Sequence, residues 1–236
     1  MTSLAGQRIV ITGAADGLGA AIARVFAIEG AELVLMDRDE HGLARVAAAT
    51  GGDAVVVNLA DADATKAAIA QAAERPVNAL IHNAAILRPE PFPHVTLSTF
   101  RETVDVGIQA AFLLSKGVWQ GMVAQGSGML IFVSSQSGIR GFADETAYCA
   151  AKHGLEGLSK CLALEGAAHG ILSCTITPGM AMRTPMSERN YPPELKKTWV
   201  EPERLAPGFA RIITERDAAL SGQRLNAWAL STGSAP

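Results

Sequence analysis

The chain has 236 residues with a formal net charge of -3, and hydrophobic residues make up 49% of it. A chain of this length suits one large α/β domain, so we expect a single domain over residues 1–236. The slight negative charge gives no basic surface, which argues against nucleic acid as a partner. The longest apolar runs fall far short of the ~20 residues that a membrane span requires, which argues against a membrane partner.

The cysteines and histidines exclude two further classes of protein. The three cysteines are an odd number without CxxC spacing, which suits a reducing compartment better than a disulfide framework. Residues 1–6 (MTSLAG) lack the basic start and apolar run of a signal peptide, so we expect a cytoplasmic protein. The five histidines show no HExxH or similar spacing, and no metal site is expected.

Along the chain, short aliphatic runs alternate with Ala-rich stretches of helical length. Apolar strands without polar alternation are typical of a parallel sheet that is covered on both faces. Alternation of strands and helices then predicts an α/β fold, a doubly wound, mostly parallel Rossmann-like sheet with helices on both faces. The expected strands are residues 8–12, 32–37, 54–58, 77–82, 129–134, 171–177 and 223–228, and the expected helices are residues 17–29, 41–49, 63–73, 97–122 and 147–166.

Prolines become frequent after Pro178, between short helical pieces. Because this segment follows the sixth expected strand, it leaves the sheet at its carboxyl edge, where open α/β sheets bind ligands. Two interpretations stay open for residues 180–205, a mobile lid over a substrate or an irregular connection, and we favour the lid.

The first expected strand runs into a glycine-rich turn, residues 12–19 (TGAADGLG). Glycine lets the backbone approach a phosphate closely, and the helix that follows offers free N–H groups and a positive dipole end. The GxxxGxG spacing differs from the common GxGxxG, and a close packing point is the alternative interpretation. Asp37 ends the second strand where an acid that binds an adenosine ribose is expected. A carboxylate there repels a 2′-phosphate, and Asp16 adds negative charge, so NAD is favoured over NADP. The alternative is that Asp37 is a solvated carboxylate at a strand end and that Arg38 beside it pairs with a phosphate.

Tyr148 and Lys152 are four residues apart and share one face of the last long helix. A free phenol has a pKa near ~10, and a neighbouring ammonium lowers it towards the range in which acid/base catalysis is efficient. This spacing is also common on ordinary amphipathic helices, so its context decides. Ser135 follows the fifth strand at the ligand edge, where a hydroxyl can hold a substrate oxygen, with Ser134 and Ser137 as rivals.

Taken together, these motifs resemble the short-chain dehydrogenase/reductase family in its single-domain branch. The resemblance implies NAD(P) as cofactor and hydride transfer between a secondary alcohol and a ketone. It implies that Tyr148 exchanges a proton with the substrate oxygen, that Lys152 holds the nicotinamide ribose and lowers the tyrosine pKa, and that Ser135 orients the substrate. The cofactor site that it implies comprises Gly13, Asp16, Gly17, Leu18, Gly19, Asp37, Asn58, Leu59, Asn83, Ala84, Tyr148, Lys152, Pro178, Gly179 and Thr184.

The chain departs from the family pattern at several positions. The family's NNAG reads His82-Asn83-Ala84-Ala85, and Thr184 comes one residue later than usual after Pro178-Gly179. Gly107 stands where the family has an asparagine that supports a proton relay to the lysine. The family resemblance therefore leaves two functions open, an active NAD-dependent dehydrogenase and a catalytically weak or inactive dinucleotide-binding protein.

For the small-molecule substrate, two interpretations compete. Arg140, or else Arg88 or Arg183, follows an expected strand at the ligand edge and suits a polyol, a sugar or a hydroxy acid. Met180 and Met182 offer an adaptable apolar wall that suits a less polar substrate equally well. The helices at residues 97–122 and 147–166 are apolar over more than one face, so we expect a homo-oligomer, a dimer or tetramer.

Overall fold

The computed structural model describes residues 3–233, and the expected domain, residues 1–236, extends beyond them at both ends. Within the described residues, parallel strands form one seven-stranded sheet in the order β3-β2-β1-β4-β5-β6-β7. The chain moves outward from β1 to β3 and then returns to place β4 beside β1, which is the doubly wound topology that the sequence predicts. The strands are β1 (Arg8–Thr12), β2 (Glu32–Asp37), β3 (Asp53–Val56), β4 (Ala79–His82), β5 (Gly128–Val133), β6 (Ile171–Thr177) and β7 (Arg224–Asn226).

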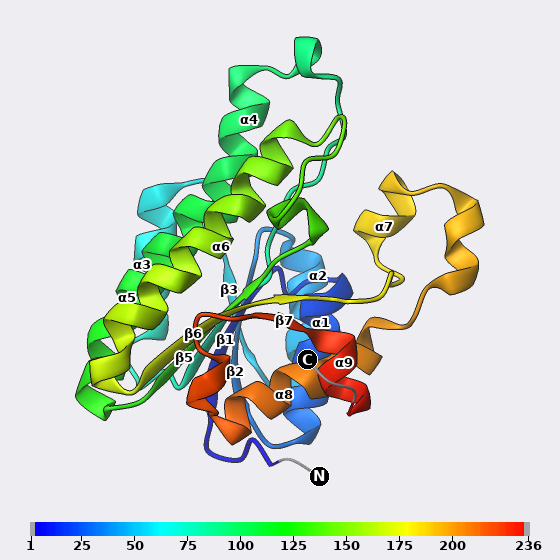
Figure 1. The fold of residues 1–236 in the computed structure, drawn as a ribbon. Helices are drawn as coiled ribbons and strands as arrows, with labels where there is room; N and C mark the ends of the chain where they lie inside the picture. The colour runs from blue at the N-terminus through cyan, green and yellow to red at the C-terminus, as the bar shows by residue number, and fades with distance from the viewer. Residues whose placement is uncertain (1–2, 234–236) are drawn as a thin grey trace.

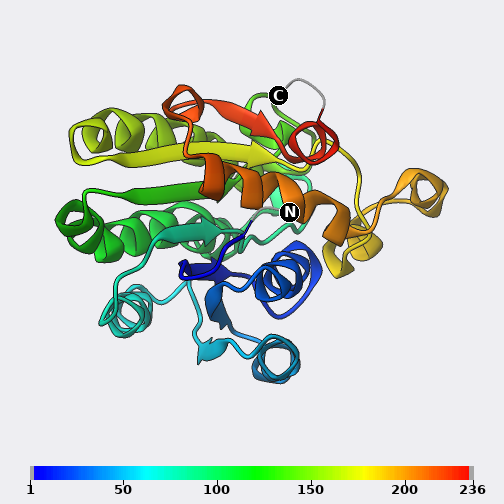
Figure 2. The same ribbon diagram turned by 90° about the horizontal axis from the view of Figure 1, so that it is seen from below.

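Helices cover both faces of this sheet, and the predicted Rossmann-like α/β fold is confirmed (Figures 1 and 2). One face packs against α1 (Gly17–Ile28), α2 (Glu40–Thr50), α8 (Ala206–Glu215) and α9 (Ala227–Thr232). The other face packs against α3 (Ala62–Ala72), α5 (Ala110–Gln125) and α6 (Thr146–Gly166), and α4 (Leu97–Val104) extends this layer beside α6. Among residues 3–233, no helix combines the length and the apolar character that crossing a lipid bilayer needs.

The apolar runs form strands because both of their faces are buried. In β1, the side chains of Ile9 and Ile11 join the core on the α1 side, while Val10 joins the core on the α5 side. In β5 all six residues are buried, and they alternate between the same two cores. Side chains of successive residues point to opposite faces of a sheet, so a strand between two helix layers needs an uninterrupted apolar sequence.

The helix expected over residues 97–122 is interrupted. α4 ends at Val104, a π-helical turn follows over Asp105–Gln109, and α5 begins at Ala110. Such turns are rare and widen the helix by one residue. The interruption brings Gly107 close to α6, a contact that becomes important at the candidate site.

The proline-rich segment after β6 leaves the body of the protein and returns to it (Figure 1). It contains α7 (Pro185–Asn190) and the 3-10 turns η5 (Pro193–Thr198) and η6 (Pro202–Leu205). Its base is closed by a bridge between Met182 and Val200, with hydrogen bonds from Arg183 N–H to the Val200 carbonyl and from Val200 N–H to the Ala181 carbonyl.

Candidate active site

The glycine turn after β1 is shaped by two glycines in the left-handed region of backbone space. Gly13 has a φ of +65° and Gly17 a φ of +52°, which side chains disfavour. A Cβ on Gly13 would lie 2.8 Å from the Asn83 amide nitrogen. That amide donates hydrogen bonds of 3.1 Å to the Thr12 and Gly13 carbonyls. Asn83 therefore holds the turn from behind, while its front stays open for a phosphate.

The third glycine of the turn has a different role from the one expected. A Cβ on Gly19 would lie 2.1 Å from the Gly13 carbonyl oxygen, so the first turn of α1 packs directly under the glycine turn. Gly19 does not line the cavity described below. It supports the dinucleotide cradle by close packing and does not itself face a ligand.

Three carboxylates gather at the end of the cradle near β2. Asp37 accepts hydrogen bonds from Ala15 N–H (3.1 Å) and Asp39 N–H (3.0 Å), which fixes its carboxylate towards the turn. Burial, and then the negative charge of Asp37, raise the pKa of Asp16, and the positive charge of Arg189 opposes them. Asp16, Asp37 and Asp39 line the cavity together with Arg38, which pairs with Glu102, so negative charge predominates at this end of the site.

A cavity of about 620 Å³ opens at the carboxyl edge of the sheet and extends from the glycine turn to α7. The structure brings nearly all of the predicted cofactor residues to it, and the cradle and carboxylates fit a dinucleotide. The predicted residues that line it are Gly13, Asp16, Gly17, Leu18, Asp37, Asn58, Leu59, Asn83, Ala84, Ser135, Tyr148, Lys152, Pro178, Gly179, Met180, Met182 and Thr184.

Tyr148 and Lys152 lie on the cavity side of α6, as their spacing predicts. Lys152 is buried, its Nζ lies 5.4 Å from the centroid of the Tyr148 ring, and it donates a 2.6 Å hydrogen bond to the Val133 carbonyl. Burial lowers the pKa of Lys152 to about 8, although the negative charge of Glu156 acts to raise it. The ammonium is thus held between the end of β5 and the phenol.

The pKa of the tyrosine differs from our expectation. Burial raises the pKa of Tyr148 above its ordinary value, and the charges of Tyr191 and Glu145 act in the same direction. The group that lowers it is the Ser135 hydroxyl, and Lys152 is not among the groups that shift it. Burial is the largest effect, because a phenolate would lose its hydration there. The phenol is therefore protonated at neutral pH in this structure.

Of the three candidate serines, the geometry favours Ser135. Ser134 donates a 2.5 Å hydrogen bond to the buried Glu156 carboxylate, and Ser137 donates one of 2.7 Å to Glu145. Ser135 accepts a hydrogen bond from Ser137 N–H (3.2 Å), which orients its hydroxyl at the start of the turn after β5. Ser135 lines the cavity together with Tyr148. These two hydroxyls are placed to share one substrate oxygen.

Behind the face of α6 that carries Tyr148 and Lys152 lies a buried acid that the sequence analysis missed. Glu156 is one helical turn beyond Lys152, and it accepts hydrogen bonds from Ser134 and from the Thr175 hydroxyl (2.7 Å). The Nε of Arg224 in β7 lies 3.3 Å from the same carboxylate, and its Nη2 donates to the Ser135 carbonyl (3.1 Å). The available signal was the stripe of Tyr148, Lys152 and Glu156, four residues apart, on α6.

The start of the proline-rich segment packs against the cradle. Gly179 has a φ of +77°, and a Cβ there would lie 1.9 Å from the Asn226 side chain. Thr184 caps α7 by accepting a hydrogen bond from Ser187 N–H (3.1 Å), and a Cβ on Gly17 would lie 3.3 Å from it. Thr184 thus lies beside the glycine turn despite its late position in the motif.

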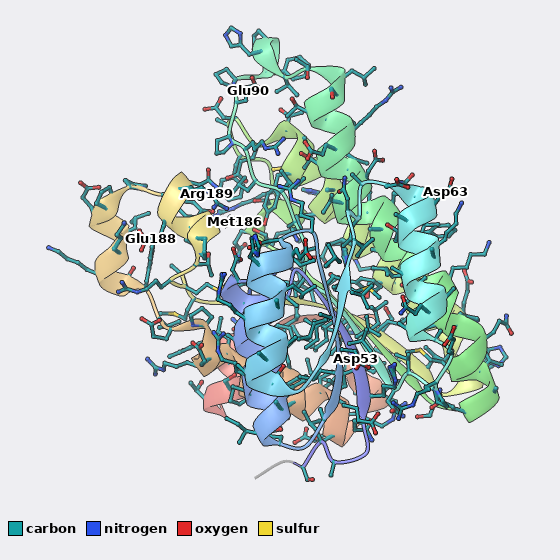
Figure 3. All side chains as sticks on the ribbon, turned by 180° about the vertical axis from the view of Figure 1, so that it is seen from behind. Asp53, Asp63, Glu90, Met186, Glu188 and Arg189 are labelled. Carbon is teal, nitrogen blue, oxygen red and sulfur yellow. The ribbon has the colours of Figure 1, made fainter. Side chains whose placement is uncertain are left out.

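The outer wall of the cavity is largely apolar. Met180 and Met182 lie on it as expected, with Met186 of α7 and Trp199. Figure 3 shows Met186 and Arg189 on the side of α7 towards the sheet, and Glu188 on the side towards η5, where it pairs with Lys196. Arg189, which the sequence analysis missed, lines the cavity.

The three arginines proposed to bind the substrate are not on this wall. The guanidinium of Arg140 lies 4.8 Å from the centroid of the Phe142 ring, and Arg140 does not line the cavity. Arg88 pairs with Glu102 (2.6 Å), and Arg183 pairs with Glu201 (3.1 Å). The structure therefore does not support Arg140 as a substrate contact.

Comparisons with known proteins agree with this description. The sequence matches the family model of short chain dehydrogenases over residues 7–194. L-xylulose reductase from Bos taurus is 32% identical over 217 residues, which cover 91% of this chain and 84% of that protein. The 2,5-dichloro-2,5-cyclohexadiene-1,4-diol dehydrogenase from Sphingobium indicum is 37% identical over 201 residues, which cover 82% of this chain and 80% of that protein.

A solved structure extends the similarity to nearly the whole chain. A protein from Beutenbergia cavernae assigned as an NAD(P)-dependent gluconate 5-dehydrogenase, with NADP bound at low occupancy, matches with a TM-score of 0.87. The match has 29% identity and covers 99% of each chain. The parallel sheet with a dinucleotide cradle at its carboxyl edge defines a Rossmann-type oxidoreductase. The chain belongs to the short-chain dehydrogenase/reductase family.

Proposed function

We propose that this protein is an NAD-dependent dehydrogenase that interconverts a secondary alcohol and a ketone, with Tyr148 as its acid/base. The observation that carries the proposal is that Tyr148, Lys152 and Ser135 meet the glycine turn in one cavity. A bound nicotinamide would accept the hydride of an alcohol or give a hydride to a ketone, and the residues of the chain bind and orient the substrate and move the proton. The proposal covers residues 1–236 as one domain, with residues 180–205 as a lid over the substrate.

The proton moves at the phenolic oxygen of Tyr148. Because burial raises its pKa, the phenol is protonated and can give its proton to the oxygen of a ketone as the alcohol forms. In the opposite direction, the phenolate accepts the proton of the alcohol. Ser135 holds the same oxygen by a hydrogen bond. Lys152 uses one of its N–H groups on the Val133 carbonyl, which leaves two for the ribose hydroxyls of the cofactor.

The preference for NAD rests on the three carboxylates at the β2 end of the cavity. A 2′-phosphate placed near Asp37 would meet like charges from Asp16 and Asp39, which is unfavourable by several kcal/mol. We expect Asp37→Ala to lower the ratio of kcat/KM for NAD to kcat/KM for NADP by at least about tenfold. Asp53→Ala is the matched control, because Asp53 at the amino end of β3 does not line the cavity, and Figure 3 shows it well away from Met186 and Arg189 of the cavity wall. An unchanged ratio in Asp37→Ala contradicts the NAD preference.

For the substrate, a polyol, a sugar or a hydroxy acid competes with a cyclic diol or ketone that has an apolar body. The name of the Bos taurus relative supports a sugar or polyol. The apolar wall formed by Met180, Met182 and Trp199, and the relative from Sphingobium indicum, support a cyclic diol. A hydroxy acid would need a cation on that wall, and Arg189 is an arginine so placed.

The test is NADH formation from a panel of polyols, hydroxy acids, cyclic diols and secondary alcohols. Tyr148→Phe removes the hydroxyl and keeps the ring, so it should bind NADH as the parent protein does and lose turnover by roughly a hundredfold or more. NADH binding is measured by fluorescence titration in both proteins. Binding without turnover on any member of the panel would instead support the alternative, an inactive dinucleotide-binding protein.

The assembly is part of the same proposal. α5 and α6 leave large apolar side chains exposed, among them Phe112 and Leu164. Exposed apolar surface on these helices supports a homo-oligomer, a dimer or homotetramer. Light scattering tests this directly, and a monomer would contradict it.

A further inference from the structure

Two positions at which the chain departs from the family pattern touch each other in the structure. His82 ends β4 and is 1% exposed, and Gly107 lies in the π-helical turn between α4 and α5. The Nε2 atom of His82 lies 3.1 Å from the Gly107 carbonyl oxygen. Its Nδ1 atom lies 3.0 Å from the Thr12 hydroxyl oxygen. The imidazole thus joins β1 to the helical turn.

The partners of His82 determine where its proton resides. A carbonyl oxygen only accepts, so Nε2 carries a hydrogen and donates it to the Gly107 carbonyl. The Thr12 hydroxyl oxygen accepts hydrogen bonds from Asn83 N–H and Ala84 N–H, each 3.1 Å long, and its own hydrogen is free for Nδ1. When the imidazole is neutral, both of its nitrogens are paired, Nδ1 with the Thr12 hydroxyl and Nε2 with the Gly107 carbonyl. The imidazole therefore has no lone pair or proton left over for a water molecule.

The charges around His82 agree with this state. Burial, and then the positive charge of Lys152, lower the pKa of His82 to about 4. Lys152 on α6 is the charged group that acts on it. β1 and the helical turn present the Thr12 hydroxyl and the Gly107 carbonyl, neither of which titrates.

Gly107 is required where the turn meets α6. A Cβ on Gly107 would lie 2.7 Å from the Cβ of Ala151, the residue before Lys152. A longer side chain, such as the asparagine of the family pattern, fits only if α6 moves. The backbone of the turn therefore packs directly on α6 at Ala151, the residue before Lys152, and the Gly107 carbonyl bonds to His82.

We propose that His82 is a positioning residue for Lys152, and that the chain Thr12–His82–Gly107 closes the inner side of the site, so that the Tyr148–Lys152 pair exchanges protons with solvent only through the open cavity. The catalytic part of this inference rests on the proposed function. The closure of the inner side rests on the contacts of His82 alone.

Two substitutions divide the contacts of His82. The Oδ1 atom of asparagine occupies the place of Nδ1, so His82→Asn keeps an acceptor for Thr12 and loses the bond to Gly107. The Nε2 atom of glutamine reaches the place of the imidazole Nε2, so His82→Gln keeps the donor for Gly107 and loses the acceptor for Thr12. His153→Gln is the matched control, because His153 is an exposed histidine beside Lys152 in sequence and bonds only within α6.

The kinetic measurement is the pH profile of kcat. In His82→Asn the inner side of the site opens and water reaches the Lys152 ammonium, which raises the pKa of Lys152 because its burial is relieved. We therefore expect the apparent pKa of the kcat profile to rise by about one unit and kcat to fall roughly tenfold. His82→Gln should keep kcat within about threefold of the parent, and His153→Gln should match it. A His82→Asn protein with lower stability but an unchanged kcat and pH profile overturns the positioning role.

A second measurement needs neither cofactor nor substrate. Because the pKa of His82 is lower in the folded state, the unfolded chain binds the extra proton as the pH falls from 6.5 to about 4, and stability is lost in this window. His82→Gln removes the titrating group, so its unfolding free energy should fall less than that of the parent across this range. Equal losses in the two proteins would mean that His82 is not held neutral, and the proposal fails whatever the turnover. If the parent shows the expected loss but turns over no substrate, the proposed function fails and the closed inner side stands.

Discussion

The floor and the outer wall of the cavity are built differently. The floor is the set of polar residues beneath the glycine turn and Lys152, in which the buried Thr12 and Glu156 contact residues far away in sequence, His82 and Arg224. The outer wall, from Met180 to Trp199, is partly exposed and apolar, and its base is closed by the bridge between Met182 and Val200. The buried contacts thus hold the floor in one geometry, while the outer wall can adapt to the shape of a bound molecule.

Removing the buried acid from the floor should have the largest effect on stability. Glu156→Ala leaves Arg224 without its partner and Ser134 and Thr175 without an acceptor. We expect a loss of about 3 kcal/mol in the free energy of unfolding, measured by urea denaturation. The double variant Glu156→Leu/Arg224→Leu removes both charges and should recover most of the loss. If Glu156→Ala is as stable as the parent protein, the contacts of Glu156 with Ser134, Thr175 and Arg224 do not stabilise the fold.

The pH dependence of stability tests the buried lysine. The pKa of Lys152 falls from 10.5 to about 8 on folding, so the unfolded chain binds more protons between these pH values. Stability therefore rises with pH across this window, by about 3 kcal/mol, and the penalty for burying the ammonium is fully present below it. Lys152→Met should lack this rise in chemical denaturation, and the difference between the two proteins removes the contributions of other groups. Parallel pH curves would contradict the buried ammonium.

A change on the outer wall should affect stability least. Trp199→Ala should alter the free energy of unfolding by less than about 0.5 kcal/mol, because Trp199 is partly exposed. It should raise KM for an apolar substrate about fivefold with kcat unchanged, since lost apolar contact acts on binding. Leu195→Ala in η5, which is exposed and does not line the cavity, is the control. A large fall in kcat would mean that Trp199 affects turnover as the floor residues do, and not substrate binding alone.

The sequence alone predicts the sheet and the floor residues that belong to local motifs. The strand β1, the glycine turn and the stripe of Tyr148 and Lys152 each have a signal within a few residues. The π-helical turn at Asp105–Gln109 was not predicted, because the apolar pattern continues through it.

Contacts between segments that are distant in sequence could not be predicted from the sequence alone. Arg224 in β7 contacts Glu156 in α6, and no local pattern links the two residues. Arg140 follows a strand at the ligand edge, as expected, but its side chain turns to Phe142. The direction of a loop side chain depends on its tertiary neighbours, which spacing does not encode.

The closed base of the proline-rich segment has a consequence for how such a protein diversifies. Because Ala181 and Arg183 both bond to Val200, the segment of residues 183–200 begins and ends at the same place on the protein. Insertions or deletions in its outer part, η5 (Pro193–Thr198), leave in place both ends of the segment and the contact of Thr184 with the glycine turn. Changes in this outer part can therefore alter the wall of the cavity while the residues of the glycine turn and of α6 stay where they are.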